Sequence, residues 1–203
     1  MHSRPAGQIV VLNGAPRSGQ SSIVLAIQET FDGVWMNIGV DVFARRVTPR
    51  RYRPGMGLRP GEEEHDLYSL QPALYAAFYD SIAAHSRSGL NVLADVGHHR
   101  REILVDCARR LKGLPALLVG VRCPIEVVMQ RRNTSPVGEY ATGSIDDPPL
   151  PVRRWQTEVH HPGIYDLEVD TSMLSPSECA ELIRRRLLEG AGTAFTRLAR
   201  LAD

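Results

Sequence analysis

The segment that most restricts the fold is a short apolar run that leads directly into a glycine-rich loop. Residues 8–13 (Gln-Ile-Val-Val-Leu-Asn) are largely β-branched and apolar, which indicates a buried strand. Residues 14–20 form the loop, and residues 21–30 follow as an expected helix. A strand, a glycine-rich turn and a helix in this order are typical of a phosphate-binding loop.

The rest of the chain alternates between strand-like and helix-like segments. At 203 residues, of which 43% are hydrophobic, the chain is long enough to bury the core of one domain, and we assign residues 1–203 to it. The alternation predicts an α/β fold, with a parallel sheet and helices on both faces. Strands are expected at residues 8–13, 34–38, 91–95, 115–122 and 165–170, and helices at residues 21–30, 67–87, 101–112, 125–132, 152–161 and 177–188.

Three segments fall outside this alternation. Residues 49–64 are rich in Arg, Gly and Pro and are expected to be irregular. Residues 133–151 are polar and contain several Pro and Gly, which is typical of a mobile flap. Residues 190–203 form a C-terminal extension with apolar residues at helical spacing. This extension is either a packed helix or a frayed end, and its apolar stripe is also a candidate dimer contact.

Composition narrows the range of partners. The 24 basic and 23 acidic residues give a net charge of +1, which disfavours nucleic-acid binding. Apolar runs are far shorter than the ~18 residues that a membrane helix needs. The three cysteines form no C-x-x-C pair, so neither a disulfide framework nor a zinc knuckle is indicated. We therefore expect a cytoplasmic monomer or homodimer.

The loop matches a Walker A motif except at one position. Gly14-x-x-x-x-Gly19-Gln20-Ser21 carries glutamine where the motif has lysine. Backbone N–H groups of such a loop bind phosphate, and the Ser21 hydroxyl is the expected ligand of Mg²⁺. A glycine-rich turn without a ligand is the alternative. The residues expected to bind ATP are Gly14, Ala15, Pro16, Arg17, Ser18, Gly19, Gln20, Ser21 and Ser22.

Five further segments are informative together with the loop: residues 9–14 (IVVLNG), 39–41 (GVD), 119–123 (VGVRC), 165–171 (YDLEVDT) and 178–180 (ECA). With these segments in this order, the chain resembles the chloramphenicol phosphotransferase family. The resemblance implies a three-layer P-loop kinase fold with a five-stranded parallel sheet and a lid. It also implies transfer of the ATP γ-phosphate to a hydroxyl of a small molecule, which is an antibiotic in the named member.

Two positions depart from the family pattern. Gln20 replaces the phosphate-binding lysine, and Ala94-Asp95 stands where the family tends to carry two acids. Either catalysis is weakened, or a nearby arginine such as Arg17 supplies the charge. The alternative function is a nucleotide-binding protein with impaired catalysis.

Asp41 lies just past an expected strand and Asp95 ends another, and ligands of open α/β sheets bind outside these carboxyl ends. The resemblance matches Asp41 to the family's general base, with an N-cap of a helix over residues 42–47 as the alternative. Asp95 is expected to hold Mg²⁺ through water, with a cap or loop acid as the alternative. An acceptor pocket is expected between Asp41, residues 49–64 and the helix over residues 67–87. The aromatic residues available there are Tyr52, Tyr68, Tyr75, Phe78 and Tyr79.

Arginines and histidines complete the candidate residues. Arg131 and Arg132 end a helix just before the flap, so one of them is expected to neutralise the transferred phosphoryl group. The alternative is a favourable interaction with the helix C-terminus. Two pairs of adjacent histidines, at residues 98–99 and 160–161, do not have the spacing of a zinc site. Contact with the acceptor is the expectation for His98.

Overall fold

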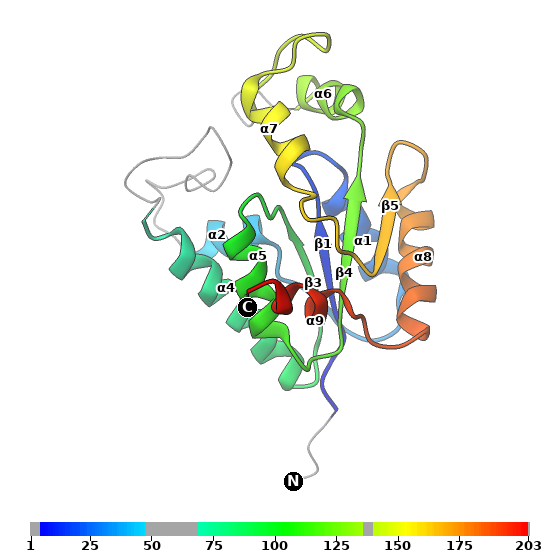
Figure 1. Ribbon diagram of the computed structural model, residues 1–203. Coiled ribbons are helices and arrows are strands. Elements are labelled where there is room, and N and C mark those ends of the chain that lie inside the picture. The colour runs from blue at the N-terminus through cyan, green and yellow to red at the C-terminus, as the bar shows by residue number, and fades with distance from the viewer. Residues whose placement is uncertain (1–4, 48–68, 136–139, 203) are drawn as a thin grey trace.

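The computed structural model describes residues 5–47, 69–135 and 140–202 (Figure 1). Its centre is a five-stranded sheet with the order β2-β3-β1-β4-β5, in which all pairs are parallel. The strands are β1 (Ile9–Asn13), β2 (Trp35–Asn37), β3 (Asn91–Val96), β4 (Ala116–Arg122) and β5 (Leu167–Asp170). The predicted α/β fold with a five-stranded parallel sheet is confirmed.

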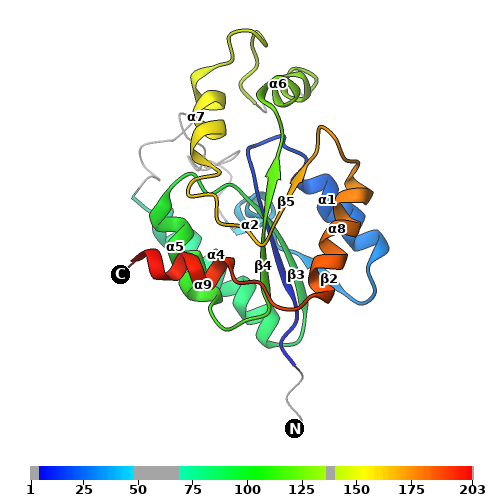
Figure 2. The same cartoon turned by 45° about the vertical axis from the view of Figure 1, so that its right-hand side comes forward.

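Helices cover both faces of the sheet, as Figures 1 and 2 show. The helices are α1 (Gln20–Thr30), α2 (Val40–Val47), α4 (Gln71–Arg87), α5 (Arg101–Leu111), α6 (Ile125–Asn133), α7 (Leu150–Glu158), α8 (Pro176–Leu188) and α9 (Ala194–Ala199), followed by a short 3₁₀ turn (Arg200–Ala202). The six helices that were expected lie close to their predicted ranges, and α2 and α9 add to them. Among the described residues, no helix is both long enough and apolar enough to cross a membrane.

Strand β1 lies in the middle of the sheet, and both of its faces are buried. Ile9 and Val11 point into a core formed with α4, α5 and α9, whereas Val10 and Leu12 point into a core formed with α1 and α8. A strand buried on two sides reads as a continuous apolar run, which is why the sequence pattern identified it. Neighbouring β3 and β4 pair with β1 in register, so that all three strands end at the same edge.

Some expectations fall on residues that the structure does not describe. The irregular segment over residues 49–64 and the side chains of Tyr52 and Tyr68 lie outside the described ranges. The predicted long helix is present as α4, which begins at Gln71. The flap over residues 133–151 is described at residues 133–135 and 140–151, where α6 ends and α7 begins.

The C-terminal extension forms a packed helix. Phe195 and Leu198 of α9 are buried in the same core as α5 and β4. The buried carboxylate of Asp166 accepts hydrogen bonds from the backbone N–H groups of Thr193 and Ala194, at 2.6 and 2.9 Å, and from that of Leu118 at 2.9 Å. Phe195 and Leu198 of the apolar stripe are therefore used inside the chain, whereas Leu201 is exposed, and the oligomeric state stays a prediction.

The packing of α9 predicts a large effect of one substitution. Phe195→Ala removes a buried ring with 4% of its surface exposed, so we expect the free energy of unfolding to fall by about 3–5 kcal/mol. Urea denaturation followed by circular dichroism measures this change. A loss below about 1 kcal/mol would mean that the extension is frayed in solution.

Candidate active site

The glycine-rich loop connects β1 to α1 at the carboxyl edge of the sheet. Gly19 and Arg17 adopt left-handed backbone conformations, with φ of 99° and 74°, and these conformations turn the chain into α1. A side chain at Gly14 would collide with the Ser18 hydroxyl and the Val121 carbonyl, so the turn requires glycine there. The first N–H groups of α1 are thereby left at the loop, in the arrangement that binds phosphate.

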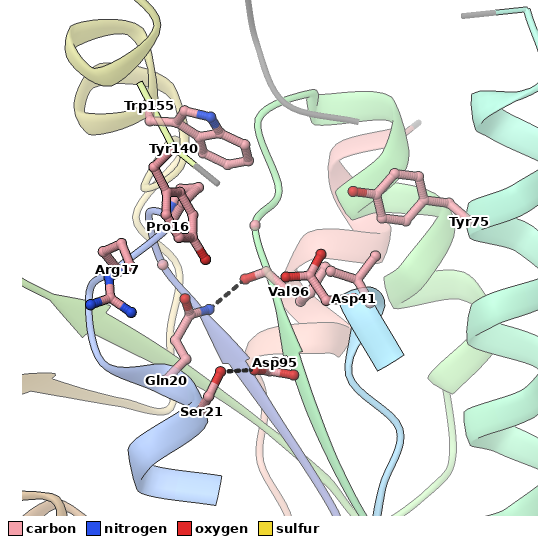
Figure 3. A pocket seen from close by; sticks show the side chains of 13 residues that line it. Pro16, Arg17, Gln20, Ser21, Asp41, Tyr75, Asp95, Val96, Tyr140 and Trp155 are labelled. Atoms are coloured by element: carbon pink, nitrogen blue, oxygen red, sulfur yellow. Dashed lines mark hydrogen bonds between the residues drawn. The ribbon is translucent and has the colours of Figure 1, made fainter. Parts of the chain in front are cut away.

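Two adjoining pockets open at this loop. The first, of about 90 Å³, is bounded by the loop, Asp41, Asp95, Tyr75 and Trp155 (Figure 3). The second, of about 300 Å³, lies between the start of α1, Arg131 and residues 171–176. The two pockets share four of their lining residues: Arg17, Gln20, Ser21 and Tyr140. We call the first the acceptor-side pocket, the second the donor-side pocket, and these four residues the junction.

The side chain of Gln20 is buried and fully hydrogen-bonded. Its Nε2 donates to the Leu12 carbonyl at 2.9 Å and to the Val96 carbonyl at 2.7 Å, and its Oε1 accepts from the Ser18 hydroxyl at 3.3 Å. The amide thus ties the end of β1 to the end of β3. Both N–H groups of Nε2 donate to backbone carbonyls, so neither is directed at the pockets.

Ser21 and Asp95 form a pair of oxygen donors beside the loop. The Ser21 hydroxyl donates to the Asp95 carboxylate at 2.7 Å (Figure 3). Burial raises the pKa of Asp95, and the nearby Asp41 charge raises it further, while the Ser21 hydrogen bond opposes the shift. A side chain at Gly39 would overlap the Asp95 carboxylate, so glycine is required there. Such hard oxygen donors fit Mg²⁺.

Asp41 lies across the acceptor-side pocket from the loop. It is the second residue of α2 and is exposed. The N-cap position belongs to Gly39, whose carbonyl accepts from the Phe43 N–H at 2.8 Å. Asp41 is therefore in the first turn of the helix and does not occupy the cap that the alternative interpretation gave it.

The two flap arginines are placed differently. Arg131 lines the donor-side pocket, where Nη1 donates to the Thr171 hydroxyl at 3.0 Å and Nη2 to the Thr171 carbonyl at 2.8 Å. Arg132 is only 1% exposed, and its Nε donates to the Ala141 carbonyl at 2.9 Å. Arg132 lines neither of the two pockets, so of the two residues Arg131 is the one at the site.

His98 is directed into the protein interior, which corrects the expectation that it contacts an acceptor. The ring is stacked near Tyr79, whose hydroxyl lies 2.7 Å from His98 Nε2, and His98 Nδ1 lies 3.0 Å from Asn13 Oδ1. Because Asn13 Oδ1 can only accept, Nδ1 carries the proton and Nε2 accepts from Tyr79. Burial lowers the pKa of His98 to about 3, so the ring is neutral.

Asn13 extends this buried network towards the residues that follow α7. Its Nδ2 donates to the Val159 carbonyl at 2.8 Å and to the Tyr165 hydroxyl at 2.7 Å. The Tyr165 hydroxyl in turn lies 2.8 Å from Nδ1 of His160. The last residue of β1 therefore positions the segment that follows α7. Helix α7 itself carries Trp155, which lines the acceptor-side pocket.

Two aromatic pocket residues were absent from the sequence-based candidates. Tyr140 and Trp155 line the acceptor-side pocket from the flap and from α7. Of the aromatic residues predicted there, Tyr75 lines the pocket, but Phe78 and Tyr79 are core residues. The available signal was an aromatic residue in an otherwise polar flap for Tyr140 and one on an expected helix for Trp155, and neither indicates the direction of the side chain.

The neutral His98 predicts a specific dependence of stability on pH. Because the folded pKa is about 3 and the ordinary value is 6.5, the unfolded chain takes up one more proton between these values. We expect the free energy of unfolding to fall by about 1.4 kcal/mol per pH unit as pH decreases from 6 to 4. This contribution should be absent from His98→Gln.

The measurement is the difference between the two proteins in urea denaturation at several pH values. Taking the difference cancels the other titrating groups, including His160, whose pKa is also lowered by burial. A difference that does not change over this range would place an ordinary, solvated histidine at position 98.

Comparison with known proteins supplies a family and a fold. Residues 7–188 match a family model described as "Chloramphenicol phosphotransferase-like protein". A Mycobacterium tuberculosis protein, present in two strains and named "Putative O-phosphotransferase", is 30% identical over 193 residues, covering 89% of this chain and 82% of its own length. The resemblance seen in the sequence is confirmed.

Solved structures of low sequence identity share the fold. The tunicamycin resistance protein of Deinococcus radiodurans is 16% identical, with a TM-score of 0.64 over 89% of this chain and 95% of its own. The APS kinase CysC of Mycobacterium tuberculosis is 16% identical, with a TM-score of 0.62 and coverages of 90% and 98%. Shikimate kinase of Acinetobacter baumannii is 12% identical, with a TM-score of 0.60 and coverages of 91% and 94%.

Proposed function

Since the chain belongs to the chloramphenicol phosphotransferase-like family, we propose that it is an ATP-dependent O-phosphotransferase. Its acceptor is a hydroxyl of a small molecule, for which an antibiotic such as chloramphenicol is the first candidate. The observation that carries the proposal is the position of the Asp41 carboxylate, across the acceptor-side pocket from the N-terminus of α1. A base on one side and a phosphate cradle on the other are what hydroxyl phosphorylation requires.

In this proposal the donor-side pocket holds ATP. The backbone N–H groups of the loop, residues 14–22, bind its phosphates, and Arg131 contributes charge from the lid side. Ser21, and Asp95 through water, would hold Mg²⁺, which when bound would neutralise part of the triphosphate charge.

The acceptor hydroxyl is placed between Asp41 and the junction. Asp41 is exposed and is therefore able to take up the hydroxyl proton as the new O–P bond forms. Tyr75 and Trp155 supply flat apolar walls, which favour an acceptor with a ring or another apolar face. A lid formed by α6, residues 140–149 and α7 stands over the carboxyl edge of the sheet (Figure 1), where it limits the access of water.

A second candidate is a nucleotide-binding protein without turnover. The observation that favours it is Gln20, which brings no charge and whose amide is engaged by the Leu12 and Val96 carbonyls. Such a protein binds ATP at the same loop and releases it unchanged.

One experiment tests the proposed reaction. The protein is incubated with ATP, Mg²⁺ and a panel of hydroxylated compounds that includes chloramphenicol, and the mixture is analysed by mass spectrometry. We expect one compound to gain a single phosphate with a matching release of ADP. ATP binding without any phosphorylated product or ADP would favour the non-catalytic candidate.

The role of Asp41 predicts a separation of catalysis from binding. Asp41→Asn keeps the size of the side chain but removes the base, so kcat should fall by about 10²–10⁴ while nucleotide affinity stays nearly unchanged. Steady-state kinetics and calorimetric titration with ATP measure the two quantities. If turnover persists and the free energy of unfolding falls by about 0.3–1 kcal/mol instead, Asp41 stabilises the first turn of the helix and does not serve the reaction.

A further inference from the structure

The proposed function calls for a positive charge beside the phosphates of ATP, and Gln20 does not supply it. A Walker A lysine normally accompanies the phosphates nearest the transferred group. Gln20 is neutral, and both of its N–H groups are held by the carbonyls of Leu12 and Val96. To turn towards a phosphate, the amide would have to leave two buried carbonyls with fewer partners, which is costly.

The place where this charge is needed is the junction of the two pockets. A phosphoryl group that moves from ATP to an acceptor must pass between the donor-side and acceptor-side pockets. Arg17 is the only cation among the four junction residues. Among the described residues that line either pocket, the other cation is Arg131, which lines the donor-side pocket alone and donates to Thr171.

The guanidinium of Arg17 is held in place but its charge is not neutralised. Nη2 donates to the Arg131 carbonyl at 3.0 Å, and the guanidinium carbon lies 5.5 Å from the centroid of the Tyr140 ring. Its contacts among the described residues include no carboxylate, and its buried Nε has no hydrogen-bond acceptor there. The left-handed backbone, with φ of 74°, sets the direction of the side chain.

We propose that Arg17 is the phosphate-binding cation of this loop and takes the part that lysine plays in a Walker A motif, an inference that rests on the proposed binding of ATP. In this proposal the positive charge is carried by Arg17, in the turn before α1, and not by the first residue of α1, which is Gln20. A guanidinium binds a phosphate through two parallel N–H donors and keeps its charge under all physiological conditions. Arg17 donates to the Arg131 carbonyl of α6 and contacts the Tyr140 ring. Phosphate binding is therefore also linked to the position of these lid residues.

Calorimetric titration of binding tests the assignment without relying on turnover. The ligands are Mg·ATP and adenosine, and the proteins are the wild type, Arg17→Gln, Arg17→Lys, Gln20→Lys and the double variant Arg17→Gln/Gln20→Lys. Arg17→Gly is a second neutral variant, because glycine accepts the left-handed backbone without strain. Arg185→Gln is the matched control, since Arg185 lies on α8 with its side chain 69% exposed and paired with Glu181.

We expect Arg17→Gln and Arg17→Gly to bind ATP about tenfold to hundredfold more weakly, with adenosine affinity unchanged. Arg17→Lys should recover most of the loss, and the double variant should recover part of it. Gln20→Lys alone should gain little. Arg185→Gln should behave as the wild type with both ligands.

Three results would overturn the assignment. The first is equal ATP affinity in Arg17→Gln, Arg17→Gly and Arg185→Gln. The second is an equal loss for ATP and adenosine, which indicates a structural role of Arg17. The third is a large gain from Gln20→Lys with no loss from the Arg17 variants, which makes Gln20 a simple defect. A wild type that binds ATP but phosphorylates no compound overturns the proposed reaction and leaves the Arg17 result valid, whereas a wild type that binds no ATP overturns both.

Discussion

The hydrogen bonds from the Gln20 amide to the Leu12 and Val96 carbonyls hold the site together. Strands β1 and β3 are paired up to Asn13 and Val96, and the chain then continues from them into different parts of the site. A side chain with two N–H donors, on the first residue of α1, bonds to both strand ends. Glutamine at this position supplies these hydrogen bonds but no positive charge.

The fold was predictable because its determinants are local. Strand β1 is a continuous apolar run, and the loop after it carries glycines where the backbone needs a left-handed turn at Gly19 and a close approach at Gly14. The positions of Asp41 and Asp95 were predictable for a related reason: Asp41 follows β2 and Asp95 is the last residue but one of β3, and the ends of parallel strands meet at one edge. Periodicity and topology together were enough for these residues.

Other side chains could not be placed from the sequence because their directions depend on distant partners. His98 follows β3 just as a site residue would, but Tyr79 and Asn13 draw it into the interior. Arg131 and Arg132 are adjacent on one helix, and the Thr171 and Ala141 carbonyls decide which of them reaches the site. Hydrogen bonds between residues far apart in the sequence, such as Asn13 with the Val159 carbonyl, leave no periodic signal.

The Asp166 carboxylate links the region that matches the family model to the helix that follows it. The family match ends at residue 188, whereas α9 begins at residue 194. A protein shortened to the matched region would keep every candidate site residue but would leave Asp166, with only 1% of its side chain exposed, without the N–H groups of Thr193 and Ala194. It would also uncover the side of β4 and α5 that Phe195 fills. The sequence boundary of the family is therefore not a boundary of the folding unit.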